Sequence, residues 1–262
     1  MTSSPSSSWN PNQYEKFKNE RSQPFFDLMD MVHPIPNGTA IDLGCGTGEL
    51  TAALHRHLQA SSTTGLDSSD TMMQDAQKFA GNGLSFTFGD INTWSADKKY
   101  GVIFSNAALQ WCDNHPDLFK RLYEALVPGG QLAVQMPMNH DYPTHTLAAQ
   151  MSHEEPWKTL LKGQTYEKAN TMMLAEDYAT LLFKLGFAEQ KAHVEIYGHK
   201  LGSREEVVEW VKGSMLTHFR SRLSKDDYEK FLTAYKERLF KILPDDRPFF
   251  YPFKRLFLWA RR

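Results

Sequence analysis

Ile41-Asp-Leu-Gly-Cys-Gly-Thr-Gly-Glu-Leu50 is the stretch that decides the fold. The apolar run Thr39–Leu43 leads into three alternating glycines, Gly44, Gly46 and Gly48. A helix-compatible segment, 49–58, follows at once, so the order predicts a strand, a tight turn and a helix. Because glycine has no Cβ, the turn can take positive φ angles and a ligand can lie against its backbone. The free N–H groups of the new helix would then face that ligand.

The spacing of these glycines narrows the kind of ligand. It is G-x-G-x-G, and not the G-x-G-x-x-G of dinucleotide-binding proteins or the G-x-x-x-x-G-K-[ST] of phosphate loops. No lysine follows to hold a phosphate, and the charge of Asp42, just before the first glycine, would oppose one. A carboxylate there favours a cationic or hydroxyl-bearing ligand. A tight turn that binds nothing is the alternative at this point.

An acidic residue ends the second predicted strand, 63–66. Asp67 lies about twenty residues past the glycines, where an acid can accept hydrogen bonds from both hydroxyls of a ribose. Its alternative role is to cap the helix predicted over 70–79. Ser68 or Ser69 could also fill that role.

Polar residues also follow the third and fourth predicted strands. Residues 84–88 alternate like a strand and lead to Asp90 and Ile91. The carboxylate of Asp90 can accept from an exocyclic amine while Ile91 covers an adenine face. Residues 101–105 form the next predicted strand and lead to Asn106.

Two further elements complete the pattern, a helix over 118–126 and a fifth strand over 131–135. Five βα units in series predict an α/β fold with a doubly wound parallel sheet. In such a sheet, ligands bind outside the carboxyl ends of the strands. The residues singled out above all fall at such ends, namely Gly44, Asp67, Asp90 and Asn106.

Together these segments resemble the class I S-adenosylmethionine-dependent methyltransferases. The elements that carry the resemblance are Asp42-Leu-Gly-Cys-Gly-Thr-Gly48, Asp67, Gly89-Asp90-Ile91 and Pro128-Gly129-Gly130. The resemblance implies a seven-stranded, mostly parallel sheet whose last strand, around 249–260, is antiparallel and inserted beside the sixth.

A narrower resemblance extends over nearly the whole chain, to the trans-aconitate methyltransferases. It is carried by Trp9-Asn-Pro-Asn-Gln-Tyr14, Glu20-Arg21-Ser22, Ser105-Asn-Ala-Ala-Leu-Gln-Trp111, Leu132-Ala-Val-Gln-Met-Pro137, Pro143-Thr-His145 and Arg255-Leu-Phe257. It implies methyl-ester formation on a small polycarboxylic acid, with S-adenosylmethionine as the cofactor. His140-Asp141-Tyr142 and 154–174 match nothing in the family pattern, which leaves the exact acid open.

The resemblance also implies a domain organisation. A disordered tail, 1–10, is expected before a single methyltransferase domain, 11–262. The domain would carry an N-terminal helical lid over 11–32, and helical cap segments over about 140–180 and 202–246.

The family pattern, carried over residue by residue, predicts two sets of site residues. The cofactor set is Arg21, Asp42, Gly44, Cys45, Gly46, Gly48, Asp67, Ser68, Met72, Asp90, Ile91, Asn106 and Leu109. The acceptor set is Trp9, Tyr14, Gln110, Trp111, Gln135, Asn139, His145, Arg220 and Arg255. Arg222 and His218 are further candidates for binding carboxylates, although Arg220 and Arg222 equally fit ordinary surface charges.

Methyl transfer to a carboxylate is an in-line displacement that requires no catalytic base, because an acid with a pKa near 4 is already ionised at pH 7. The chain must align the reacting atoms and exclude water, with orientation supplied by Arg21, Trp111 and His145. Trp111 could instead be a core residue behind the fourth strand.

Composition limits the remaining possibilities. The 262 residues have a formal net charge of −2, which argues against a nucleic-acid partner. No apolar run approaches the roughly 20 residues that span a bilayer. Two cysteines, Cys45 and Cys112, favour a reducing, cytoplasmic location, and Cys45 is expected to be a packing residue. The histidines lack metal-ligand spacing, so no metal is expected. A monomer is expected.

Three alternatives stay open from sequence. The acceptor could be a long-chain or carrier-bound acid. The chain could hold the cofactor without transferring anything. An NAD-dependent oxidoreductase is disfavoured, since the glycine spacing is wrong for that cofactor.

Overall fold

The computed structural model describes residues 18–166 and 172–262, with side chains from residue 22 onward. Within these residues the chain divides into two compact units. Among the described residues, the sheet unit comprises Asn19–Pro137, 172–195 and Lys254–Arg262, and the helical unit contains 138–166 and Ile196–Phe253. Strands β6 and β7 run through both units. The expected arrangement of one domain with cap segments stays a prediction, as does the disordered tail.

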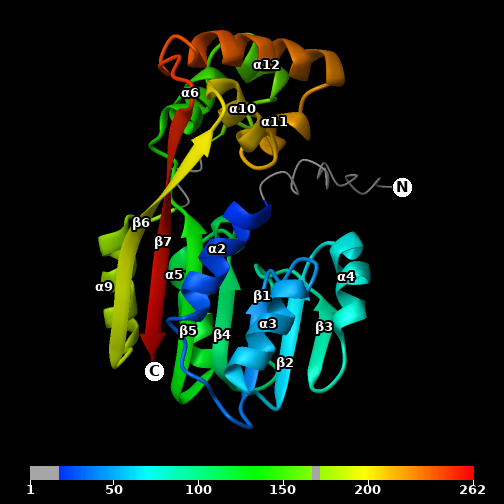
Figure 1. The fold of residues 1–262 in the computed structure, drawn as a ribbon, viewed down its shortest axis with the longest axis vertical. Coiled ribbons are helices and arrows are strands. Elements are labelled where there is room, and N and C mark those ends of the chain that lie inside the picture. Colours follow the sequence, from blue (N-terminus) through cyan, green and yellow to red (C-terminus); the bar gives the residue numbers. More distant parts are fainter. Residues whose placement is uncertain (1–17, 167–171) are drawn as a thin grey trace. The chain divides into compact units, whose positions relative to one another are not determined.

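The sheet unit holds a seven-stranded sheet in the order β3-β2-β1-β4-β5-β7-β6 (Figure 1). Strands β1 to β5 pair in parallel, and β7 pairs antiparallel with β5. The sequence-based fold class is therefore confirmed. The strands are β1 (Thr39–Leu43), β2 (Ser62–Asp67), β3 (Leu84–Phe88), β4 (Tyr100–Asn106), β5 (Leu126–Pro137), β6 (Glu189–Leu201) and β7 (Phe249–Arg261).

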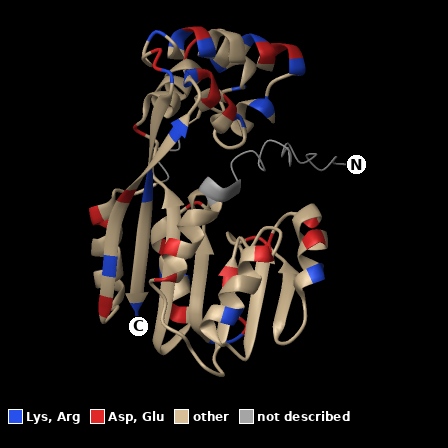
Figure 2. Cartoon of the chain, viewed as in Figure 1, with Lys and Arg blue, Asp and Glu red and all other residues tan. Residues whose placement is uncertain are grey.

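Helices lie in front of and behind this sheet, and the parallel strands carry few charged residues along most of their length (Figures 1 and 2). Strands that are buried on both faces have mostly apolar side chains, so they can be recognised in the sequence as apolar runs. The helices and turns of the sheet unit are α2 (Lys18–Met29), α3 (Glu49–Leu58), α4 (Asp70–Ala76), η1 (Gln77–Phe79), η2 (Leu109–Trp111), α5 (His115–Ala125) and α9 (Ala175–Leu185).

The boundaries of α5 differ from the sequence-based expectation of 118–126. The helix begins three residues earlier because the Asn114 side chain accepts from Asp117 N and a proline stands at the start of the first turn. It ends at Ala125, and β5 begins at Leu126 instead of Gln131. Pro128-Gly129-Gly130, which the sequence predicts to be the turn into the fifth strand, therefore lies within β5, where Gly129 has a φ of 77°.

The helical unit is built from short helices that share one apolar core. They are α6 (Pro143–Ser152), α7 (Trp157–Leu160), α10 (Arg204–Lys212), α11 (Thr217–Arg220) and α12 (Lys225–Leu239). The helical period of the apolar residues in 226–243 predicts that one stripe packs internally: Tyr228, Phe231, Leu232, Tyr235 and Leu239. In α12 all five residues are buried in this core, which confirms that prediction.

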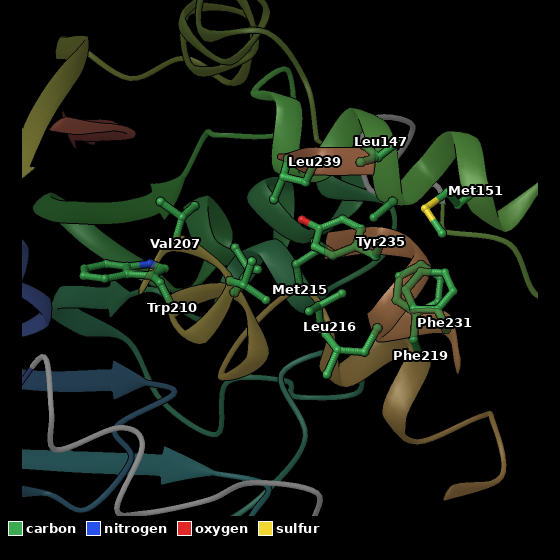
Figure 3. Close-up of a cluster of buried hydrophobic side chains, with 14 of the residues drawn as sticks. Leu147, Met151, Val207, Trp210, Met215, Leu216, Phe219, Phe231, Tyr235 and Leu239 are labelled. Atoms are coloured by element: carbon green, nitrogen blue, oxygen red, sulfur yellow. The ribbon is translucent and has the colours of Figure 1, made fainter. Parts of the chain in front are cut away.

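Aromatic rings fill the centre of that core (Figure 3). Phe231 has no exposed surface, and its ring stacks on Phe219 with centroids 4.2 Å apart. Trp157 meets the Phe231 ring edge-on at 5.3 Å. The buried Tyr235 hydroxyl donates to Thr144 O at 2.9 Å, so α12 is joined to α6 by a polar contact as well as by packing. No helix within the described residues is both long and apolar enough to cross a membrane.

Phe231→Ala is expected to lower the free energy of unfolding by about 3–5 kcal/mol, because it leaves a cavity among rings that cannot collapse into it. Urea denaturation followed by circular dichroism measures the change. Phe183→Ala is the matched control, because that ring is 73% exposed and its loss should change stability little. Equal losses for the two variants would contradict this account of the core.

Candidate cofactor site

The glycine turn after β1 is held by the end of β2. Gly44 N and Cys45 N both donate to Leu66 O, at 2.7 and 3.1 Å. Gly46 N donates to Asp67 Oδ2 at 3.0 Å. The turn and the predicted ribose-binding acid therefore form one hydrogen-bonded substructure at the carboxyl end of the sheet.

The three glycines of the turn all have positive φ angles, of 82°, 55° and 77°, but they differ in surroundings. A Cβ on Gly44 would stand 2.1 Å from the Ala108 Cβ, and one on Gly48 would meet the Phe86 ring at 2.7 Å. A Cβ on Gly46 would meet only the Met72 sulfur, at 3.5 Å. Gly44 and Gly48 thus lack side chains because the protein packs against them. Gly46 is the position where bare backbone is left open to a ligand.

Asp67 keeps hydrogen-bonding capacity although it supports the turn. Its Oδ1 accepts from Ser69 N at 3.0 Å, and its Oδ2 accepts from Gly46 N. Each carboxylate oxygen has about two acceptor sites, so both oxygens can accept a further hydroxyl. Ser69 is the residue that caps α4, since its side chain accepts from Met72 N. The alternative that Asp67 is the helix cap is therefore excluded.

Asp42 lies beneath the turn and is buried, with 2% of its surface exposed. The Thr51 hydroxyl donates to its Oδ2 at 2.6 Å, which ties α3 to β1. Burial raises the pKa of Asp42 to about 7, and the charge of Asp67 adds to the rise while the Thr51 hydrogen bond opposes it. Sequence reasoning did not identify Thr51, because a threonine inside a helical pattern carries no distinctive signal.

Cys45 is a packing residue, as expected. It is buried, forms no disulfide, and packs in a small cluster with Met73 and Ala76, against which Phe86 lies. Burial, with the charges of Asp42 and Asp67, raises the pKa of its thiol above the usual range, so the group stays protonated.

The loop after β3, which carries Asp90 and Ile91, is fixed from α5. Asp90 Oδ1 accepts from the backbone N–H of Asn92 at 2.9 Å. The Arg121 guanidinium donates to Asn92 O at 2.8 Å and also reaches Trp94 O and Ile91 O. Arg121 is a second supporting residue that the motifs did not reveal.

Polar side chains meet at the carboxyl ends of β4 and β5. Asn106 stands opposite Gln135 in the parallel pair, and Arg255 of β7 stands opposite Pro137. Because residues two apart on a strand share a face, Gln135 and Arg255 lie on the same face of the sheet. Gln135 is fully buried and Arg255 is 5% exposed. Within the described residues, Asn106 Oδ1 and both amide atoms of Gln135 are buried without a hydrogen-bond partner.

Such atoms are rare in folded proteins and call for an explanation, such as a ligand or an ordered water. The nearby Gln131 shows the usual state of a buried amide. It accepts from His33 N and Trp259 Nε1 and donates to His33 O, all within 3.1 Å.

The remaining predicted residues fall in several places. Trp9 and Tyr14 lie outside the described residues, and Arg21 belongs to α2 but its side chain is not described. Trp111 is 51% exposed, which excludes the alternative of a core residue. Ser68 and Met72 flank the start of α4, and Leu109 and Gln110 belong to η2.

Several acceptor candidates belong to the helical unit. Asn139 donates from its Nδ2 to the Tyr251 hydroxyl at 3.3 Å. Burial and the neighbouring His140 lower the pKa of His145 to about 4, partly offset by Asp141. His145, which the sequence suggested as a cation for an acceptor carboxylate, is therefore neutral at pH 7 and does not supply a positive charge. Arg220 is exposed, and Arg222 donates to Gln164 Oε1, as surface residues do.

Comparison with known proteins shows which family this chain belongs to. Residues 40–130 match the family described as "Methyltransferase domain". Trans-aconitate 2-methyltransferase of Deinococcus radiodurans is 39% identical over 97% of this chain and 98% of its own length. The chain belongs to the trans-aconitate methyltransferases.

A second relative agrees with this family. Trans-aconitate 2-methyltransferase of Rhizobium meliloti is 36% identical over 97% of this chain and 99% of its own length. As a member of this family, the chain is an S-adenosylmethionine-dependent methyltransferase, and S-adenosylmethionine is its cofactor.

Solved structures share the fold of this methyltransferase. The YcgJ protein of Bacillus subtilis superposes with a TM-score of 0.59 at 11% identity, over 91% of this chain and 97% of that one. Phosphoethanolamine N-methyltransferase 2 of Haemonchus contortus, in complex with S-adenosyl-L-methionine, gives a TM-score of 0.54 at 18% identity. That match covers 96% of this chain and 56% of the other. At such identities the likeness concerns the fold alone.

The residues present in this methyltransferase fit the cofactor. A nucleoside with a charged amino-acid tail needs hydrogen-bond acceptors and a bare surface to lie on. Asp67 and the buried Asn106 Oδ1 supply the acceptors, and the open backbone at Gly46 supplies the surface. Among the side chains that the structure describes, no group of three or more His, Cys, Asp or Glu is placed to hold a metal ion.

Gly44→Ala is expected to weaken S-adenosylmethionine binding at least about tenfold, because the new methyl group would push Ala108 and the turn apart. Calorimetric titration measures the affinity. Gly129→Ala is the matched control, since Gly129 also has a positive φ, of 77°, but has nothing within 4 Å of a Cβ. Ala108→Gly should restore binding to the Gly44→Ala variant. Equal affinities for wild type and Gly44→Ala would contradict the packing argument.

Asp42→Asn is expected to change how stability depends on pH. The folded state holds the Asp42 proton up to about pH 7, whereas an unfolded Asp releases it near pH 4. Between these values the folded state binds more protons, so the contribution of Asp42 to stability falls as pH rises. The fall is about 1.4 kcal/mol for each pH unit that separates the two pKa values.

Asn cannot titrate, so the variant should gain stability relative to wild type from pH 4.5 to pH 7. Denaturation at several pH values measures the difference. Parallel profiles for the two proteins would show that Asp42 is ionised in the folded state over this range.

Proposed function

We propose that this chain transfers the methyl group of S-adenosylmethionine to one carboxylate of trans-aconitate or a closely similar small polycarboxylic acid. The names of the relatives support this acceptor, because two of them, at 39% and 36% identity, are trans-aconitate 2-methyltransferases matched over almost their full length. The observation in this chain that supports it is the buried polar group formed by Asn106, Gln135 and Arg255.

These residues suit a carboxylated ligand. The Gln135 amide has an N–H to donate, and the guanidinium of Arg255 is a preferred partner of carboxylates. Both are buried side chains on the paired strands β5 and β7, so little side-chain freedom is lost when an acid binds. A buried amide without a partner is unfavourable, and a bound carboxylate would relieve that penalty.

When bound, S-adenosylmethionine would supply an electrophilic methyl group: the bond from its methyl carbon to the positively charged sulfur would break as a carboxylate oxygen bonds to that carbon, which leaves a methyl ester and a neutral thioether. The protein's own part is to hold the cofactor through Gly46, Asp67 and Asp90, and the acid through Gln135 and Arg255. Negative and positive charge neutralise each other in the transition state, so exclusion of water by buried groups favours reaction. Alignment of the reacting atoms can contribute several kcal/mol.

The other predicted acceptor residues keep the status of proposals. Trp9, Tyr14, Gln110, Trp111, Asn139, His145 and Arg220 are proposed to contact the acid or shape its surroundings, with His145 as a neutral hydrogen-bonding group. The cytoplasmic location, the monomeric state and the lack of a nucleic-acid partner stay predictions.

The central experiment is methyl transfer from labelled S-adenosylmethionine to a panel of free acids. We expect label in trans-aconitate and similar tricarboxylic acids and much less in monocarboxylic acids. If label appeared only in long-chain or carrier-bound acids, the proposal that a small polycarboxylic acid is the acceptor would be wrong. Tight cofactor binding without transfer to any acid would favour a non-catalytic binding module.

Gln135→Leu is expected to raise the KM for the acid about tenfold or more, because a hydrogen bond to a charged group is lost. The same change should increase thermal stability without the acid, because it removes a buried amide that has no partner. Steady-state kinetics and thermal melts measure the two effects. Affinity for S-adenosylmethionine should stay within about twofold of wild type.

Gln131→Leu is the matched control on the same strand. Its amide is fully bonded to His33 and Trp259, so the substitution should lower stability and leave the acid KM nearly unchanged. If Gln135→Leu behaves like Gln131→Leu in both measurements, Gln135 does not bind the acid.

A further inference from the structure

A buried chain of hydrogen bonds connects α9 to the loop that follows β4. The hydroxyl of Tyr178 in α9 is bonded to His115 Nδ1 at the start of α5. His115 Nε2 is bonded to Leu109 O in η2, at 3.0 Å. Tyr178, His115 and Leu109 are all buried, with at most 1% of their surfaces exposed.

The chemistry of the end groups fixes the direction of these bonds. A carbonyl oxygen only accepts, so the Leu109 contact requires the proton on His115 Nε2. The Nδ1 atom of a neutral ring then accepts, and the Tyr178 hydroxyl donates to it in preference to the Met172 sulfur, a weaker acceptor 3.8 Å away. The Tyr178 oxygen in turn accepts from Met173 N at 3.4 Å. In every bond of this series, the donor therefore lies on the side of Met173 and the acceptor lies on the side of Leu109 O.

The loop at the far end of this chain carries proposed site residues. It runs from Asn106, whose Oδ1 is buried without a partner among the described residues, to the exposed Trp111. Ala107 holds a left-handed φ of 54°, which is a strained conformation for a residue with a side chain. Such a conformation persists only where the surroundings hold it.

Hydrogen bonds to other elements of the protein hold this loop near both of its ends. Ala107 N donates to Gln135 O at 2.9 Å, which anchors its beginning to β5. Within the loop, Gln110 Nε2 donates to Ala107 O, and Cys112 N donates to Leu109 O. The anchor of its end is the His115 ring, which meets the same carbonyl of Leu109 from inside the protein.

We propose that His115 and Tyr178 are positioning residues for methyl transfer, which hold the loop 106–111 in the conformation that accepts the acid. This inference rests on the proposed function, because only that function places the loop beside a bound acid. A small displacement of reacting groups slows transfer strongly, so a rigid support distant from the chemistry affects turnover. His115 does not touch the acid, and it takes up or releases no proton in the reaction.

Tyr178→Phe removes one hydroxyl from the hydrogen-bond chain and keeps the ring. We expect the KM for trans-aconitate to rise about tenfold, as for the loss of a partner to a buried polar group, with S-adenosylmethionine affinity within about twofold of wild type. Tyr100→Phe is the matched control. It also removes the hydroxyl of a buried tyrosine, bonded to Asp97 at 3.0 Å, at the opposite end of β4. It should leave the KM unchanged.

Two substitutions of His115 separate its two bonds. The Gln side chain places an N–H near the former Nε2, so His115→Gln keeps a donor for Leu109 O. The Asn side chain ends near the former Nδ1, so His115→Asn keeps only the bond with Tyr178. We expect His115→Gln to retain more kcat/KM for the acid than His115→Asn. The reverse order would overturn the role of the Leu109 contact.

Hydrogen–deuterium exchange gives a readout that does not depend on activity. Peptides that contain Trp111 and Cys112 should exchange faster in Tyr178→Phe and His115→Asn than in wild type or Tyr100→Phe. Faster exchange with no methylation of any acid would refute the proposed function and leave the support of the loop intact. Unchanged exchange, or an unchanged acid KM in an enzyme that methylates trans-aconitate, would overturn the positioning role.

A measurement on the wild type covers the case in which the variants fail to fold. Nitrogen-15 NMR of the histidine rings identifies the tautomer of His115, with the His115→Gln spectrum or selective labelling for assignment. The proposal requires a neutral ring protonated at Nε2 at pH 7.5. A ring protonated at Nδ1, or at both nitrogens, would overturn it.

Discussion

The carbonyl oxygen of Leu66 is the point on which the site depends. It accepts hydrogen bonds from two successive N–H groups, those of Gly44 and Cys45, while the next residue of β2, Asp67, accepts from Gly46 N. The path of the glycine turn is thus determined by the end of the neighbouring strand. Any change in the pairing of β1 with β2 would move the open backbone of Gly46 and the acid beside it together. The proposed ribose and methionine subsites are therefore coupled through the backbone.

A second level of support comes from residues below the loops. Thr51 holds Asp42, Arg121 holds the loop after β3, and His115 holds the loop after β4. All three lie on helices that pack against the sheet, whereas the groups proposed to touch ligands lie on strands or on the loops that follow them. This arrangement lets a packed scaffold determine the position of irregular backbone.

Much of the sheet unit could be predicted from sequence, because its signals are local. The strand Thr39–Leu43, the helix Glu49–Leu58 and the strand Leu84–Phe88 were placed with their observed bounds, since apolar runs and glycines mark where each begins and ends. The prediction for α5 was less accurate, since its first turn depends on a cap by Asn114 that the apolar period does not reveal. Asp67, Asp90 and Asn106 were predicted to lie at strand ends because parallel strands bring such ends to one edge.

The supporting residues and the helical unit could not be derived in the same way. Nothing near His115 in the sequence points to Tyr178, which lies 63 positions away. Among the described residues, the Gln131 amide has hydrogen-bond partners and the Gln135 amide has none, and this difference depends on which residues of other segments pack against each amide. The neutral state of His145 likewise depends on burial and on His140, neither of which a motif shows. For the helical unit, the apolar period identified the buried stripe of α12 but not its ring contacts with α7 and α11.

The order of the strands has a consequence for how this chain folds during synthesis. β6 pairs in the sheet only with β7, which follows it after residues 202–248 and lies between it and β5. On the ribosome, β6 must therefore wait unpaired while that segment is translated, for roughly 2–10 s at about 5–20 residues per second. During that interval its backbone N–H and C=O groups have no partner strand, so they are open to chaperones or to other nascent chains.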